Sequence, residues 1–294
     1  MIPAAGRGTR LLPVTKELPK EMLPIFDRGP SGGLVTKPIL QLVFERAHDA
    51  GLREFCFIVG RGKRAIEDHF ATSSNPNNFV SEPRRQQFES MLGLSSRVDD
   101  SVIIWVNQPE PRGFGDAVLR AQPFVGNEPF LVLAGDTEII WPSKHYLNAI
   151  LNAYETAKSK AEALFYVKRV PDARNYGVAE LDETFTPPRV KAVKEKPASP
   201  RSDVAVMPVY IFQPTIFKAL ENVSNGTCET ELTDGIQRLI DWGLDVRALK
   251  LPEEALHLDI GNPSSYWEAL KMSHELASFS EQSSKDDPGS QPSG

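Results

Sequence analysis

The sequence predicts an α/β fold built around a mostly parallel sheet. Short apolar runs alternate with amphipathic segments along the chain, which is the pattern of strands connected by helices. Of the 294 residues, 40% are apolar and 24% are charged, so the chain can bury a substantial core, as an ordinary globular protein does. Because we find neither an internal repeat nor a composition break of the kind that marks a linker, we expect one domain over residues 1–277.

Each expected element rests on a local pattern of apolar residues. The strands are expected at Glu54–Val59, Val102–Val106, Phe130–Leu133, Ala163–Val167 and Val204–Phe212. Helices are expected over Lys37–Ala50, Gly115–Ala121, Lys144–Ala157 and Glu231–Trp242. The first of these helices places its apolar residues on one face, and Gly51 follows as a stop signal.

Three segments have the composition of loops or of a disordered tail. Arg28–Thr36 is rich in glycine and proline, and Thr72–Asn78 consists of polar turn residues. From Ser278 to the end the chain lacks apolar periodicity, so we expect residues 278–294 to be disordered.

Charge and cysteine content exclude several classes of protein. The formal net charge is −6 and no block of like charges occurs, which argues against nucleic acid or an anionic membrane as the main partner. The two cysteines form no C-x-x-C and the histidines form no i,i+4 pair, so a zinc site has no support. No run approaches the roughly 20 apolar residues of a membrane span, and no signal peptide is visible. We therefore expect a cytoplasmic protein.

Two motifs near the N-terminus are suited to binding phosphate. In Ile2–Arg10 (IPAAGRGTR), small residues and two glycines let backbone N–H groups approach an anion, and Arg10 adds a fixed charge. This segment is neither a dinucleotide-binding G-x-G-x-x-G nor a Walker P-loop. Ten residues later, Pro19–Pro24 (PKEMLP) places Lys20 on a stiff extended backbone, where an ammonium can be held beside phosphates.

Together, G-x-G-T-R and P-K-x-M-L-P resemble the signature of the sugar-1-phosphate nucleotidyltransferase family. The resemblance is strongest to its bacterial-type branch that uses UTP and glucose 1-phosphate, and it includes Gly60–Phe70 (GRGKRAIEDHF). It runs in register from Ile2 to about Ala277. It implies a Rossmann-like, glycosyltransferase-A-type three-layer sandwich with a mixed, mostly parallel central sheet. It also implies Arg10 and Lys20 as catalytic charge stabilisers, and a loop that wraps the triphosphate through Ala4, Ala5, Gly6, Gly8 and Thr9.

The same resemblance assigns a base-reading pair and a metal site. Gln108 and Gly113 match the residues that read the pyrimidine edge, and an amide can both donate to and accept from a uracil. Asp136, just past an apolar strand, and Asp259, in His257–Asn262 (HLDIGN), match two carboxylates that bind Mg²⁺. Relatives often read L-P-D where this chain has A-G-D, followed by Thr137 and Glu138.

The sugar-phosphate site is implied by three further segments. Gly177 in Y-G-V and the Glu195–Lys196 pair in E-K-P match residues that hold the sugar and its phosphate, and Glu229 matches an acid near the sugar. Arg28–Thr36 is an insertion relative to the family pattern. Relatives also carry several apolar residues before the glycine loop, so we expect the natural start to lie upstream of Met1.

The resemblance implies attack of a sugar-1-phosphate oxygen on the α-phosphorus of UTP, without a general base. Three alternatives remain open at this point. The enzyme could use dTTP or another sugar, because uracil and thymine differ by one methyl. The chain could be a non-catalytic nucleotide-sugar sensor, although it keeps both acids and both cations. It could be a glycosyltransferase, of which Asp136–Glu138 (DTE) imperfectly echoes the D-x-D motif. A homo-oligomer is compatible with the sequence.

Overall fold

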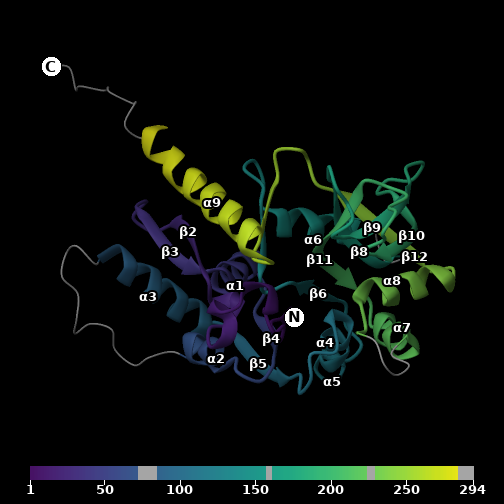
Figure 1. Ribbon diagram of the computed structural model, residues 1–294, viewed down its shortest axis with the longest axis horizontal. Coiled ribbons are helices and arrows are strands. Elements are labelled where there is room, and N and C mark those ends of the chain that lie inside the picture. Colours follow the sequence, from purple (N-terminus) through teal and green to yellow (C-terminus); the bar gives the residue numbers. More distant parts are fainter. Residues whose placement is uncertain (72–84, 157–160, 224–228, 284–294) are drawn as a thin grey trace.

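The computed structural model describes residues 1–71, 85–156, 161–223 and 229–283 (Figure 1). Parallel strands β1 (Ile2–Pro3), β4 (Glu54–Val59) and β5 (Val102–Asn107) form a sheet in the order β1-β4-β5. The larger sheet has the order β6-β11-β8-β12-β10-β9. Its strands are β6 (Phe130–Leu133), β8 (Ala161–Arg169), β9 (Gly177–Asp182), β10 (Arg189–Glu195), β11 (Val204–Phe212) and β12 (Asp245–Lys250).

Backbone hydrogen bonds join the two sheets through the short strand β1. The N–H of Leu133 donates to Met1 O at 3.1 Å, and the N–H of Gly135 donates to Pro3 O at 3.1 Å, as in a parallel pair. The N-terminal half is therefore parallel, whereas the larger sheet pairs its strands antiparallel except for β8 with β12. The predicted mixed α/β class is confirmed, and parallel pairing dominates in the N-terminal half only.

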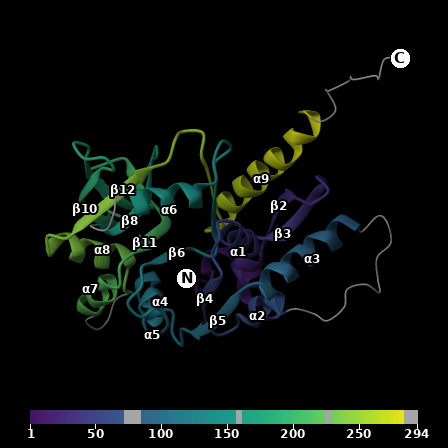
Figure 2. The ribbon, with the colours of Figure 1, turned by 180° about the vertical axis from the view of Figure 1, so that it is seen from behind.

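Helices cover both parts of this continuous sheet (Figures 1 and 2). Around the N-terminal half lie α1 (Ile39–Asp49), α2 (Arg64–Phe70) and α3 (Arg85–Asp99). At the other end lie α4 (Phe114–Arg120), α5 (Gln122–Val125), α7 (Thr215–Val223) and α8 (Leu232–Asp241). Between them runs α6 (Tyr146–Thr156), and α9 (Pro263–Ser283) extends away from the body beside the hairpin β2 (Pro24–Arg28) and β3 (Leu34–Pro38). No described helix is both long and apolar enough to span a bilayer.

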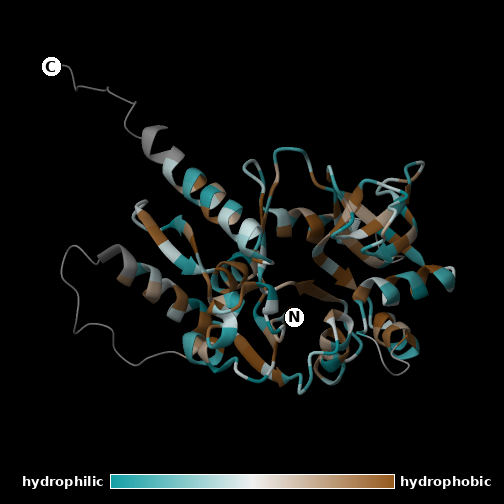
Figure 3. Ribbon diagram, in the orientation of Figure 1, coloured by the Kyte–Doolittle hydropathy of each residue, from teal (hydrophilic) through white to brown (hydrophobic). Residues whose placement is uncertain are grey.

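Apolar residues are concentrated in the strands of the sheet and occur along the helices that cover it (Figure 3). One cluster packs α1 against β4 and one face of β11, with Phe44 and Phe57 fully buried. A second packs α7 and α8 against β8 and the other face of β11, and it includes Phe165 and Phe217. The two clusters take alternate residues of β8 and β11, so they lie on opposite faces of the larger sheet.

Helix α1 ends where the sequence predicts. Gly51 adopts φ 95°, a left-handed conformation that suits glycine. Its N–H donates to His48 O at 2.9 Å, and the N–H of Leu52 donates to Ala47 O at 3.2 Å. This pair of bonds is the Schellman motif, in which glycine closes the last turn.

Two loop predictions are corrected by the structure. The segment expected as a loop over Arg28–Thr36 belongs to the β2–β3 hairpin, because its alternating side chains pair across strands and only residues 29–33 form the turn. The tail expected from Ser278 is helical as far as Ser283, since α9 continues through it. Residues 284–294 and the loop predicted at Thr72–Asn78 lie outside the described residues.

Candidate active site

The site forms where the parallel strands of the N-terminal half end. The loops after β1, β5 and β6 leave the same edge of the sheet, which is where open α/β sheets bind ligands. Two cavities of about 750 and 420 Å³ open there. They adjoin, because seven residues line both of them: Arg10, Lys20, Phe114, Asp136, Lys196, Glu231 and Gly261.

The larger cavity is lined by the glycine loop. Ala5, Gly6, Gly8, Thr9 and Arg10 all face it. Gly8 adopts φ 63°, and a side chain there would also press on the Thr15 side chain at 3.1 Å, so the turn needs glycine.

Two neighbours hold the ends of this loop. The Thr15 hydroxyl donates to Gly8 O at 2.7 Å. Ala4, expected to bind the nucleotide, lies in the core instead, and its N–H already donates to Ile58 O at 2.8 Å. It lines neither cavity.

Gln108 and Gly113 lie at the far side of the larger cavity. Gln108 is 3% exposed, and its amide nitrogen donates to Gly113 O at 3.2 Å and to Asp116 Oδ2 at 2.7 Å. Gly113 adopts φ 101°, and a Cβ there would lie 2.5 Å from Thr230 O. Glycine is therefore required both by the backbone conformation and by the close approach of the segment before α8.

An ion pair between Lys20 and Asp136 marks the boundary between the cavities. The Lys20 ammonium donates to the Asp136 carboxylate across 116 residues of sequence, and both side chains are nearly buried. Burial opposes the charge of each group and is the largest single influence, but the partner's charge, the hydrogen bond between them and the neighbouring groups together outweigh it. The pKa of Lys20 is therefore raised and that of Asp136 is lowered. A second buried pair, Lys63 Nζ to Glu21 Oε2 at 2.6 Å, fastens the turn that carries Lys20.

Asp259 is brought beside Asp136 by a two-stranded ladder. Strands β7 (Thr137–Ile140) and β13 (Leu256–Asp259) pair antiparallel with Asp259 opposite Thr137, and the N–H of Ile260 donates to Asp136 O at 3.1 Å. Burial, reinforced by the charge of Asp136, raises the pKa of Asp259. Two carboxylates held this way match a Mg²⁺ ion that takes its remaining ligands from phosphates and water. In the described chain, no three His, Cys, Asp or Glu side chains form a metal-binding group by themselves.

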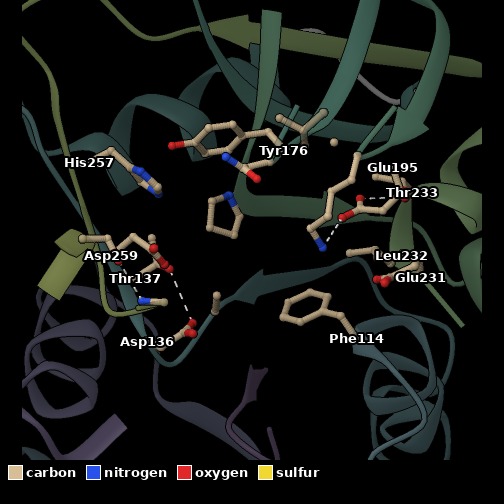
Figure 4. Close-up of a pocket in the computed structure, with 18 of the residues that line it drawn as sticks. Phe114, Asp136, Thr137, Tyr176, Glu195, Glu231, Leu232, Thr233, His257 and Asp259 are labelled. Carbon is tan, nitrogen blue, oxygen red and sulfur yellow. Dashed lines mark hydrogen bonds and ion pairs between the residues drawn. The ribbon is translucent and has the colours of Figure 1, made fainter. Parts of the chain in front are cut away.

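The smaller cavity is built from side chains on β9, β10 and the start of α8 (Figure 4). Glu195 pairs across the strands with Gly177, and its carboxylate accepts from Thr233 Oγ1 at 3.1 Å and from Lys196 Nζ at 2.8 Å. Lys196 adopts φ 34°, the only positive φ outside glycine among the described residues. Such a conformation is costly for a lysine and turns the chain so that its N–H donates to Tyr176 O at 3.0 Å.

One residue expected at the sugar lies elsewhere. Glu229 lines the larger cavity, beside Arg112 and Gly113, and does not line the smaller one. The reason is local: the N–H of Thr230 donates to Arg112 O at 2.7 Å, which holds this segment beside the turn at Gly113.

The structure adds residues that sequence reasoning did not select. His257 lines the smaller cavity and faces Tyr176 (Figure 4), and its Nε2 is buried with no hydrogen-bond partner in the described structure. Burial lowers the pKa of His257 to about 4, so the ring is neutral. Glu231 also faces the cavity, and burial together with the charge of Glu195 raises its pKa. The sequence signal that could have identified His257 is its spacing. It lies two residues before Asp259 on the same strand, so the two side chains lie on the same face.

Glu138 does not join the acidic groups of the site. Its side chain is fully buried and accepts a hydrogen bond from the Tyr146 hydroxyl at 3.1 Å. It lines neither cavity, so Asp136 and Glu138 do not form a D-x-D pair facing the same ligand. This geometry removes the main sequence argument for a glycosyltransferase.

An open α/β sheet with a glycine loop and paired carboxylates at its strand ends defines a nucleotide-binding protein of the transferase type. The family model described as nucleotidyl transferase matches residues 1–275. The chain therefore belongs to the nucleotidyl transferase family.

Named relatives and solved structures agree with this assignment. The chain is 37% identical to the UTP–glucose-1-phosphate uridylyltransferase of Bacillus subtilis strain 168, over 81% of this chain and 79% of that protein. It is 38% identical to UTP–glucose-1-phosphate uridylyltransferase 2 of Streptococcus pyogenes serotype M3, over 81% and 78%. Among solved structures, a UDP-glucose pyrophosphorylase in complex with UDP-glucose has a TM-score of 0.78 at 28% identity, covering 94% of this chain and 97% of its own. The UTP-bound enzyme from Acinetobacter baumannii has a TM-score of 0.76 at 27% identity, covering 97% and 98%.

Proposed function

We propose that this protein transfers a uridylyl group from UTP to glucose 1-phosphate, giving UDP-glucose and pyrophosphate. The observation that carries the proposal is the pair of adjoining cavities with Lys20 and Asp136 at their boundary. One cavity is suited to a nucleotide and the other to a sugar, so two substrates can meet at the shared wall. The names of the relatives supply the identity of both substrates.

The reaction follows from the charges at the boundary. An oxygen of the sugar phosphate attacks the α-phosphorus of UTP, the bond from that phosphorus to the bridging oxygen breaks, and pyrophosphate leaves with the electron pair. The second pKa of a phosphate monoester is about 6, so the nucleophile is already ionised at neutral pH and no base is needed. Arg10, Lys20 and Lys196 all line both cavities, so each lies at the shared wall where it can stabilise negative charge on the reacting phosphates.

Asp136 and Asp259 are the residues that would hold Mg²⁺. When bound, such an ion neutralises charge on the phosphates. The Lys20 ammonium donates to the Asp136 carboxylate, so its positive charge lies at the same place. Lys20 is thereby kept protonated and close to where the phosphates would lie.

The sugar end of the smaller cavity supplies hydrogen-bonding groups. The Glu195 carboxylate is held by Thr233 and Lys196, and an acceptor fixed in this way suits sugar hydroxyls. Gly177 leaves space beside it, because a Cβ would lie 3.2 Å from Glu195 Oε2 and 2.8 Å from the Thr233 methyl. Neutral His257 faces the same space.

The test is pyrophosphate release across a matrix of triphosphates and sugar 1-phosphates, with and without EDTA. We expect UTP with glucose 1-phosphate to give the highest kcat/KM, dTTP to be the nearest competitor, and EDTA to abolish turnover. Asp136→Asn should lower kcat by at least about tenfold while the melting temperature is retained. Preference for ATP or GTP would overturn the choice of UTP. Full activity in excess EDTA would overturn the metal assignment.

A further inference from the structure

The side-chain amide of Gln108 has both of its hydrogens committed to the protein. Gln108 follows β5, and its backbone N–H donates to Val59 O at 2.7 Å, which fixes the start of the side chain. The amide nitrogen then donates to Asp116 Oδ2 at 2.7 Å and to Gly113 O at 3.2 Å. An amide NH₂ has two donors, so neither is left for a ligand.

Asp116 decides which way this amide faces. A carboxylate only accepts hydrogen bonds, so it can face the amide nitrogen but repels the amide oxygen. Asp116 is 5% exposed and lines neither cavity, and Arg120 Nη2 donates to its other oxygen at 3.3 Å. Turning the Gln108 amide over would set its oxygen against two acceptors, Asp116 Oδ2 and Gly113 O, in a buried place, which is costly. The orientation is therefore held by the Gly113 carbonyl and by the shorter bond to Asp116, which lines neither cavity.

The group left for a ligand is the Gln108 amide oxygen, an acceptor, beside the turn at Gly113 that lines the same cavity. A uracil or thymine ring presents N3–H, a donor, flanked by carbonyl oxygens. Cytosine presents an unprotonated N3 and an amino group instead, so its N3 would face the Gln108 oxygen with no proton between them. We propose that Asp116 is a positioning residue that makes the nucleotide site selective for bases carrying N3–H. This inference rests on the proposed function.

The decisive variant is Asp116→Asn, which keeps the size of the side chain but can either donate or accept. A donor at position 116 replaces the closer of the two acceptors that oppose the turned amide and leaves only the more distant Gly113 carbonyl, so the amide can turn at lower cost and offer its NH₂ to the base. We expect the ratio of kcat/KM for UTP to that for CTP to fall at least about tenfold, mainly through higher use of CTP. Arg120→Ala is the matched control, because it removes a contact of Asp116 and leaves the carboxylate, and its ratio should stay within about twofold of wild type.

Several outcomes separate this proposal from a merely structural role and from the proposed function. Equal losses with UTP and CTP and an unchanged ratio would overturn it, since damage to the fold lowers both rates together. If Asp116→Asn has no cooperative melting transition, Asp116→Ser is measured in its place, because a hydroxyl can also donate to the Gln108 oxygen. An unchanged ratio in that variant overturns the proposal as well.

If wild type releases no pyrophosphate from UTP, the proposed function fails. If wild type strongly prefers UTP and the variant keeps that preference, the role of Asp116 alone fails.

Discussion

The two adjoining cavities are shaped by different parts of the chain. We call the larger cavity, proposed to bind the nucleotide, the nucleotide half, and the smaller one, proposed to bind the sugar, the sugar half. The nucleotide half depends on backbone conformation: Gly8 and Gly113 adopt positive φ, and neighbouring chain segments leave no room for a Cβ at Gly113. The sugar half depends on side chains that strands present to one another, such as Glu195 held by Lys196 and Thr233. The shape of a site made by backbone depends on a few residues that can adopt its conformation. In a site made by side chains, each binding group can be changed separately by substitution. We therefore expect substitutions in the two halves to fail in different ways.

The largest effect is expected at the boundary, from Lys20→Ala. This change removes the ammonium that neutralises Asp136 and faces both cavities, so transition-state charge loses its nearest fixed cation. We expect kcat to fall roughly 10²–10³-fold with a smaller change in KM for either substrate. Lys16→Ala, at an exposed lysine in the same segment, is the control and should leave kcat near wild type. A large rise in KM with unchanged kcat would instead make Lys20 a binding residue.

In the nucleotide half, the sharpest test is Gly113→Ala. Its Cβ would lie 2.5 Å from Thr230 O, which is backbone and cannot swing away, and φ 101° is unfavourable for alanine. We expect KM for UTP to rise about tenfold or more and the free energy of unfolding to fall by about 1–3 kcal/mol. Gly126→Ala is the matched control, because its φ is 62° and no atom lies within 4 Å, so it measures the cost of backbone strain alone. Equal losses of stability in the two variants would show that the contact with Thr230 matters little.

In the sugar half, Lys196→Ala is expected to act on one substrate. Lys196 is half exposed, and its Nζ lies 2.8 Å from Glu195 Oε1. Removing this side chain takes away a cation proposed to bind the sugar phosphate, and it leaves no fully buried charge unpaired because Glu195 is itself partly exposed. We expect KM for glucose 1-phosphate to rise about tenfold while kcat and KM for UTP change little. Titration calorimetry with each substrate measures this directly, and Lys194→Ala, at the exposed position two residues earlier on β10, is the control. Equal weakening of both substrates would mean that Lys196, which lines both cavities, contributes to binding both substrates.

What the sequence predicts of this site follows the same division. The sequence shows part of the backbone half, because glycines mark unusual conformations: residue type and spacing predict a phosphate-binding loop at Gly8, and the family resemblance implies the turn at Gly113. Contacts between distant segments cannot be predicted from local residue patterns. Lys20 pairs with a residue 116 positions away, and Asp259 reaches Asp136 only because β7 and β13 pair. The assignment of Glu229 to the sugar differs from the structure for the same reason, since the bond from the Thr230 N–H to Arg112 O holds its segment beside the larger cavity.

Whether an element can be predicted depends on how clear its local apolar pattern is. Strand β4 and helix α1 were located closely because their apolar residues repeat with a clear period, and Gly51 ends the helix. The sequence predicts a loop over Arg28–Thr36 because the glycines and proline of the turn mask the strand residues on either side of it. Helix α9 is not predicted, and it extends into the segment from Ser278 that is expected to be disordered, because a weak apolar pattern does not exclude a helix.

The smallest effect on catalysis is expected behind the boundary, at Glu138 on β7, where a substitution should change stability instead. Burial raises the pKa of Glu138 from 4.5 to about 8, and Oε1 has no hydrogen-bond partner among the described residues. The charge of Arg46, whose Nε lies 4.0 Å from Oε1, lowers the pKa but does not offset burial. A carboxyl with a raised pKa is protonated in the folded state while the unfolded chain ionises. The free energy of unfolding therefore falls by up to roughly 1.4 kcal/mol per pH unit between pH 4.5 and about 8, and does not fall further above that.

Glu138→Gln removes this titration, so its melting temperature should be close to that of wild type near pH 4.5 and progressively higher toward pH 8. Glu128→Gln, at an exposed position, is the control. A constant difference in melting temperature across this range would mean that Glu138 is ionised in the folded protein, held by Arg46 and not by its own proton.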